Sequence, residues 1–294
     1  MSKILLLGDC HGNFQDVIQL QLESIKANLG VDLCIQCGDF GFYDRCFGTF
    51  DKMNINKFPI KTLVIGGNHD DWDFIKSSDT KEWEEKYNLF YKSRGTVEVI
   101  DGSVIAFLGG ALNVDRRQEG SIDKRTTNYI LDVEVNEAVE VFLKHPVIDL
   151  MVTHSCPHSC GVGMVGSPYF FESIEKYCHD KGHSTGRNDD CGDGALSRIY
   201  RPLIREGIKI SNWIYGHFHQ LHFKKVDETY FYCIGCSDSS DGKHEKKPFI
   251  YDTQTKRIEW LDKVSLLNSN GFHKTRLHSK DPRDNIQFGH FDKL

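Results

Sequence analysis

The chain has 294 residues, of which 36 are Lys or Arg and 42 are Asp or Glu, giving a formal net charge of −6. Its 39% hydrophobic and 27% charged residues exclude a wholly disordered, collagen-like or fibrous protein. The acidic balance argues against an extended basic face that grips nucleic acid through its phosphates, but not against a small basic pocket.

Short apolar runs alternate with helical patterns through the first two thirds of the chain. The apolar runs predict strands at residues 3–7, 31–36, 61–65, 95–100, 104–108, 147–152 and 209–215. Apolar residues at helical spacing predict helices at residues 14–28, 133–144 and 195–205, with Asn13 as the N-cap of the first. Asp101-Gly102 is a strong hairpin turn signal between two of the strands.

Hairpins dominate the last part of the predicted fold. Further strands are expected at residues 221–226, 230–234, 249–252 and 257–261. The order of elements predicts an α/β fold with mixed sheets in one domain, residues 1–265. The stretch 155–193 is read as a long loop insertion within it, and 266–294 as a polar C-terminal tail.

The N-terminal apolar run, residues 4–7, is too short for a signal-peptide core or a membrane span. We therefore expect a cytoplasmic protein with no membrane partner and with its ten cysteines reduced. Cys34 and Cys37 lie on a predicted strand, where residues three apart point to opposite faces, so they are expected to be buried side chains and not zinc ligands. No pattern in the sequence indicates an oligomeric state.

Five of the predicted strands end in residues that are common metal ligands. In open α/β sheets, ligands gather beyond the carboxyl ends of the strands, so these residues are expected to meet. The candidates in chain order are Asp9, His11, Asp39, Asn68, His154, His217 and His219.

The donor types indicate which ions the site would hold. Carboxylates, imidazoles and one amide suit divalent or trivalent ions such as Mn, Fe, Zn or Co, and the sequence does not choose among them. Seven ligands are too many for one ion and match two ions that share a carboxylate, for which Asp39 is the natural bridge. Two metals ~3.5–4 Å apart can clamp a phosphoryl group and generate a hydroxide nucleophile.

These motifs together resemble those of the calcineurin-like metallophosphoesterases. The matching blocks are Gly8-Asp9-Cys10-His11, Gly38-Asp39, Gly67-Asn68-His69-Asp70, His154 and Gly216-His217-Phe218-His219. The resemblance implies a four-layer αββα sandwich, in which two mixed β-sheets are flanked by helices. It also implies a first metal held by Asp9, His11 and His219, a second held by Asn68, His154 and His217, and Asp39 bridging both.

The resemblance further assigns two residues to catalysis. His69 would face the leaving group as a general acid, and Asp70 would orient its imidazole. The leading hypothesis is therefore hydrolysis of a phosphomonoester or phosphodiester by a metal-bridging hydroxide. One alternative is a nuclease or nucleotide phosphodiesterase on the same metals. The other is a non-catalytic scaffold, although such scaffolds lose ligand residues and all seven are present here.

Arg45 and Arg116 are the candidates for binding the remaining phosphate oxygens. Phosphoprotein phosphatases carry Gly-Asp-x-x-Asp-Arg-Gly, and residues 38–46 depart from that pattern. Residues 32–40 and 65–69 are similar to RNA lariat-debranching enzymes. Those enzymes typically carry Cys in place of Asp9 and Glu in place of Asp70, so the likeness is one of superfamily. The acidic net charge disfavours a large RNA-binding surface but leaves nucleic acid as a candidate substrate, through recognition of a single branched nucleotide. Segments 113–129 and 155–193 are expected to determine substrate choice.

Overall fold

The computed structural model describes residues 2–43, 46–55, 57–111, 129–158, 160, 192–219, 221–235, 248–267 and 273–280. One sheet comprises β1 (Lys3–Leu7), β2 (Val31–Gln36), β3 (Lys61–Val64), β4 (Leu89–Tyr91), β11 (Phe249–Asp252), β12 (Arg257–Leu267) and β13 (His273–Lys280). The other comprises β5 (Thr96–Ile100), β6 (Ser103–Leu108), β7 (Val147–Thr153), β8 (Lys209–Tyr215), β9 (His222–Val226) and β10 (Thr229–Cys233).

Both sheets are mixed. The first has the strand order β13-β12-β11-β1-β2-β3-β4, and the second the order β5-β6-β7-β8-β10-β9. Strands β1, β2 and β3 are parallel to one another, as are β7 and β8. Because the carboxyl ends of parallel strands share one edge, the loops that follow these five strands can converge.

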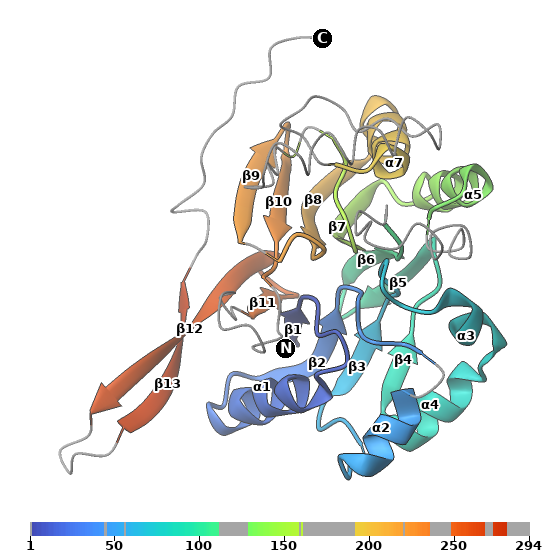
Figure 1. The fold of residues 1–294 in the computed structure, drawn as a ribbon. Helices are drawn as coiled ribbons and strands as arrows, with labels where there is room; N and C mark the ends of the chain where they lie inside the picture. The colour runs from blue at the N-terminus through green and yellow to red at the C-terminus, as the bar shows by residue number, and fades with distance from the viewer. Residues whose placement is uncertain are drawn as a thin grey trace, which may run out of the picture.

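Helices cover the outer face of each sheet (Figure 1). Those beside the first sheet are α1 (Phe14–Lys26), α2 (Cys46–Lys52), α3 (Trp72–Ser77) and α4 (Thr80–Tyr87). Those beside the second are α5 (Asp132–Phe142) and α7 (Gly194–Arg205). The predicted αββα sandwich of two mixed sheets is thus confirmed.

Three apolar cores lie between the four layers, and the side chains that alternate along the strands fill them. On β1, Ile4 and Leu6 belong to the core between the sheets, while Leu5 and Leu7 belong to the core under helices α1 and α2. A third core joins α5 and α7 to the second sheet. Side chains buried in this way contribute roughly 1.5–3 kcal/mol each, so the central strands are rigid supports for the loops at their ends.

Most predicted elements are present, with shifts of a few residues at their ends. In helix α1, Leu22 and Ile25 are exposed, and the buried residues are Phe14, Val17, Leu20, Gln21 and Ser24. Asn13 is its N-cap, but the Asn13 side chain donates to Asp16 instead of capping the helix. Cys34 on β2 and Cys37 directly after it are buried in two different cores, as expected.

The predicted insertion and tail are described only in part. Pro157 pairs with Asp193, and the Asp193 amide donates to the Cys156 carbonyl at 2.7 Å, so residues 158 and 192 lie close together. Part of the predicted polar tail instead forms strand β13, which pairs with β12. The hairpin of these two strands extends away from the sandwich (Figure 1).

Within the described ranges, no helix combines the length and apolar character needed to cross a membrane. The cytoplasmic location stays a prediction.

Candidate metal centre

The seven candidate ligands lie on loops at the adjacent carboxyl ends of five strands. Asp9 and His11 follow β1, Asp39 follows β2 and Asn68 follows β3 in the first sheet. In the second sheet His154 follows β7, and both His217 and His219 follow β8.

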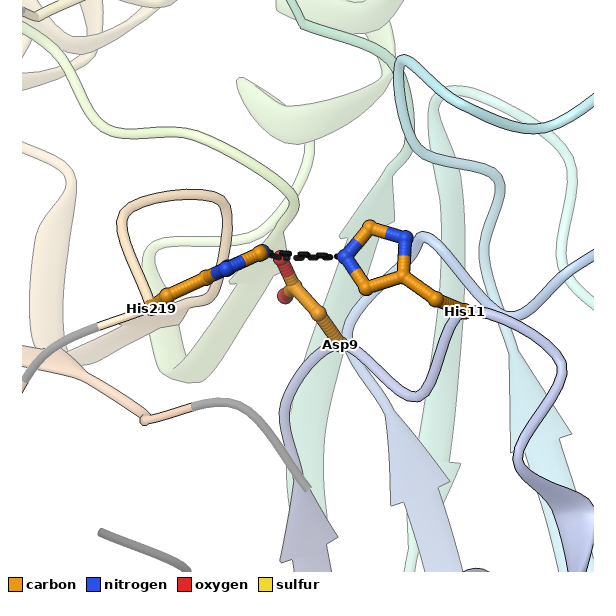
Figure 2. A group of neighbouring side chains, drawn as sticks. All are labelled: Asp9, His11 and His219. Carbon is orange, nitrogen blue, oxygen red and sulfur yellow. Dashed lines mark hydrogen bonds and ion pairs between the residues drawn. The ribbon is translucent and has the colours of Figure 1, made fainter. Parts of the chain in front are cut away.

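One group consists of Asp9, His11 and His219. The Nε2 atoms of His11 and His219 are 3.0 Å apart, and Asp9 Oδ2 lies 2.9 Å from His219 Nε2 and 3.9 Å from His11 Nε2. Figure 2 shows the three side chains pointing toward one another from loops of the two different sheets. Two ring nitrogens and a carboxylate that all lie within 4.8 Å are a donor set that fits a metal ion.

The second group lies beside the first and is more deeply buried. His154 Nε2 is 3.3 Å from Asp39 Oδ2 and 2.9 Å from Asn68 Oδ1. His217 Nδ1 lies 2.8 Å from the same Asn68 oxygen. Asp39 Oδ2 also lies 4.0 Å from His11 Nε2, so this oxygen stands between the two groups.

Local backbone strain accompanies this arrangement. His11, Asp39, His217 and His219 have φ angles of 45°, 50°, 68° and 53°, in the left-handed region that L-residues rarely adopt. Such conformations cost of order 1–3 kcal/mol each and persist where the surrounding structure enforces them, often at functional sites.

Electrostatics of the buried groups favour added positive charge. Burial acts to raise the pKa of Asp9 and of Asp39, but the charges and hydrogen bonds of the surrounding histidines, with the charge of His154 foremost, together outweigh burial and hold both pKa values below the usual value. Burial opposes protonation of His154, yet the two carboxylates raise its pKa to about 10. Burial and the charge of His154 lower the pKa of His217 to about 3. The two buried carboxylates thus favour a positive charge beside them, which the proton on His154 supplies here and which metal cations would supply in its place.

Glycines let the backbones approach the buried carboxylates. A Cβ added at Gly216 would lie 2.1 Å from Asp9 Oδ1, and one at Gly67 would lie 2.1 Å from Asp39 Oδ1. A Gly216→Ala variant is expected to displace the fully buried Asp9, to lose metal and to lose activity by about 10²-fold or more. Metal analysis and phosphate-ester hydrolysis measure both effects.

Gly48→Ala in helix α2 is the matched control for that substitution. The new Cβ would meet no atom within 4 Å, so this change should leave metal content intact and add about 0.5–1 kcal/mol of stability. Full metal content in Gly216→Ala would contradict the placement of Asp9.

His69 and Asp70 occupy very different surroundings. His69 is exposed, its ring centroid lies 5.2 Å from that of His11, and its backbone N–H donates to Asp39 Oδ1 at 2.8 Å. Asp70 is buried, and its oxygens accept from the backbone amides of Phe40, Gly41, Phe42 and Gly67. Its expected role in orienting the His69 imidazole stays a prediction.

Sequence reasoning missed supporting residues behind these loops. Gln36 ends strand β2, donates to the carbonyls of Gly8 and Gly38, and accepts from the Gly38 amide. A polar residue directly after the apolar run 33–35 was the available signal in the sequence. Cys10 Sγ donates to the Phe40 carbonyl and is buried, as its place between two ligands suggests. Arg45 and Arg116 lie outside the described residues.

Comparison with known proteins finds similarity to lariat debranching enzymes at low identity. Lariat debranching enzyme A of Xenopus laevis is 26% identical over 182 residues, which are 53% of this chain and 33% of that protein. The Homo sapiens and Saccharomyces cerevisiae lariat debranching enzymes are 22% and 23% identical over 244 residues, 74% of this chain. That alignment spans 42% of the human protein and 56% of the yeast protein.

The fold has a counterpart among solved structures. One crystal structure superimposes on 88% of this chain and 97% of its own with a TM-score of 0.54 at 12% identity, which is a likeness of fold alone. The family model described as calcineurin-like phosphoesterase matches residues 2–221, which contain all seven candidate ligands. The chain therefore belongs to the calcineurin-like phosphoesterase family.

Proposed function

We propose that the chain is a dinuclear metal-dependent phosphoesterase that hydrolyses a phosphomonoester or phosphodiester, with His69 as its general acid. In this proposal one ion is held by Asp9, His11 and His219, and the other by Asn68, His154 and His217. Asp39 would contact both ions.

One observation carries the proposal. The two groups Asp9/His11/His219 and Asp9/Asp39/His154 each bring three donor atoms within 4.8 Å, and the carboxylate that they share is that of Asp9. Asp39 Oδ2 lies between His11 and His154, at 4.0 and 3.3 Å from their Nε2 atoms. Adjacent donor sets joined by carboxylates are what two neighbouring ions require.

The chemistry divides between the metals and the protein. Bound ions of this class polarise phosphoryl oxygens and lower the pKa of water. The chain holds Asp9 and Asp39 ionised in a buried place, and it keeps His217 neutral. His69, exposed beside His11, can meet the leaving-group oxygen and give it a proton near pH 7.

The relatives give the diester alternative specific support. Lariat debranching enzymes are named for acting on a branched nucleic acid, and several of them match 53–74% of this chain. A diesterase or nuclease therefore stands as the second candidate function. The non-catalytic scaffold is disfavoured because no ligand position is lost.

Metal analysis combined with an activity panel tests the proposal. The Mn²⁺-loaded protein is assayed with p-nitrophenyl phosphate, bis-p-nitrophenyl phosphate, phosphopeptides, cyclic nucleotides and branched RNA. We expect two ions per chain and turnover of at least one ester class, with His69→Ala reducing kcat by about 10²-fold or more on esters of poor leaving groups. Two bound ions without turnover of any substrate would instead favour the scaffold.

A further inference from the structure

Arg94 is a buried arginine that lies outside the candidate ligand set. It occupies the turn between β4 and β5, and its side chain is only 7% exposed. Its Nε donates to the Gly109 carbonyl at 3.0 Å, and its Nη1 donates to the Tyr129 carbonyl at 2.8 Å and to Glu134 Oε2 at 2.5 Å. A guanidinium is rarely buried unless it is paired. Here its hydrogen bonds join the turn that carries Arg94 to three other places in the chain, Gly109, Tyr129 and Glu134.

The same guanidinium contacts the loop that carries His69 through one side chain. Its central carbon lies 3.8 Å from the centroid of the Trp72 ring, a cation–π contact. Trp72 Nε1 donates in turn to the Gly67 carbonyl at 2.9 Å. Gly67 precedes Asn68 and His69 directly, so the indole connects Arg94 to the loop after β3.

A second set of hydrogen bonds connects Arg94 to the same loop from its other side. Arg94 holds the Gly109 carbonyl, and the neighbouring Gly110 amide donates to the Gly66 carbonyl at 2.8 Å. A Cβ at Gly109 would lie 2.7 Å from the Gly66 carbonyl oxygen, and one at Gly66 would lie 2.7 Å from the Trp72 ring. The Gly66–Gly67 backbone is therefore enclosed between Trp72 and Gly109–Gly110, both held by Arg94.

We propose that Arg94 is a positioning residue that fixes the His69 imidazole through Trp72 and Gly109–Gly110. This inference rests on the proposed role of His69 as the acid. The His69 backbone continues directly from Gly67 and Asn68, and its own N–H donates to Asp39 Oδ1 at 2.8 Å, so the position of this backbone determines where the imidazole begins. Proton transfer requires hydrogen-bond reach, and a misplacement of ~1 Å can cost about 10²-fold in rate.

Leaving-group dependence separates this role from general support of the fold. Arg94→Met and Trp72→Phe are compared with wild type and His69→Ala on the nitrophenyl and phenyl esters of whichever class the protein hydrolyses. Nitrophenolate leaves without much protonation, whereas phenolate needs an acid. We expect Arg94→Met to lower kcat about 10–100-fold on the phenyl ester and less than about threefold on the nitrophenyl ester, at unchanged metal content. Trp72→Phe keeps the ring but removes the donor to Gly67, and should show the same pattern more weakly.

A readout that does not depend on turnover accompanies the kinetics. In zinc-loaded protein the imidazole NMR resonances of His69, assigned by their loss in His69→Gln, should shift in both variants. Arg198→Met is the matched control, because Arg198 also pairs with the start of α5, at Asp132 Oδ1 (2.7 Å), but is exposed. It should change neither the resonances nor the kinetics.

The outcomes distinguish this inference from the proposed function. If Arg94→Met and Trp72→Phe reduce both esters equally, or leave the His69 resonances unmoved, Arg94 does not position His69. Should Arg94→Met fail to fold, Trp72→Phe decides the question. If wild type hydrolyses nothing, the proposed function fails, while the resonances still report whether Arg94 and Trp72 hold His69.

Discussion

An Asp39→Asn variant is expected to lose bound metal and nearly all phosphoesterase activity while keeping its fold. Asp39 Oδ1 accepts the His69 amide at 2.8 Å, and an amide oxygen can accept the same bond. The other oxygen would become an NH₂ group facing His154 Nε2, at the 3.3 Å position where negative charge now lies. Each ion contributes several kcal/mol of charge stabilisation, so activity should fall by about 10³-fold or more.

Metal content by mass spectrometry and hydrolysis of the best substrate measure the two losses together. Asp32→Asn is the matched control, since Asp32 lies on β2, the strand that precedes Asp39, and is exposed. Among the side-chain hydrogen bonds described for Asp32, its two oxygens accept only from the Ser2 hydroxyl. That variant should keep both metal and activity. If the Asp39→Asn variant kept its full metal content and turned over substrate at the wild-type rate, Asp39 would not be a bridging ligand.

The candidate site was largely predictable because its residues sit at the ends of strongly apolar strands. The runs at β1, β2 and β3 are buried on both faces and read as strands without ambiguity. Glycine next to Asp9, Asp39 and Asn68 marks a sharp turn where each strand ends. Topology then requires those side chains to meet at one edge of the fold.

Several short elements were not predicted from the sequence, and the reasons are physical. Helix α4 buries only Trp83 and Tyr87, which is too few apolar positions to reveal a period. Strand β4 has three residues, below the length at which alternation is visible. Strand β13 has the sequence HKTRLHSK, in which one leucine is the sole large apolar residue, so no alternation in the sequence reveals its pairing with β12.

The contacts behind the ligands also could not be read from spacing. Arg94 and Trp72 are 22 positions apart, and their contact depends on where α3 and the β4–β5 turn fall in space. The partners of Asp70 likewise lie on a different loop, residues 40–42. Motifs name the residues that touch the chemistry, whereas tertiary packing decides which residues hold them in place.

Asp70→Asn is expected to destabilise the protein and weaken metal binding together. Asp70 Oδ1 accepts from Gly41 and Phe42 at 2.8 Å each, and Oδ2 accepts from Gly67 at 2.7 Å and Phe40 at 3.3 Å. Whichever way an asparagine is turned, its NH₂ group faces two backbone N–H donors. Hydrogen bonds to a charged group are worth about 1.5–3 kcal/mol each, so the loss of two should lower the free energy of unfolding by about 3–6 kcal/mol.

Urea unfolding and metal analysis check that result, with Asp71→Asn as the neighbouring control. Asp71 is the exposed N-cap of α3 and accepts from the amides of Asp73 and Phe74 through one oxygen, which asparagine retains. Its stability should change by less than about 0.5 kcal/mol.

A second comparison tests whether Asp70 acts only by orienting the His69 imidazole. For this, Asp70→Asn is also made in a His69→Gln background. If Asp70 acts through its four amides, Asp70→Asn costs the same stability with or without His69. If it acts only by orienting His69, the variant is as stable as wild type and lowers kcat only when His69 is present.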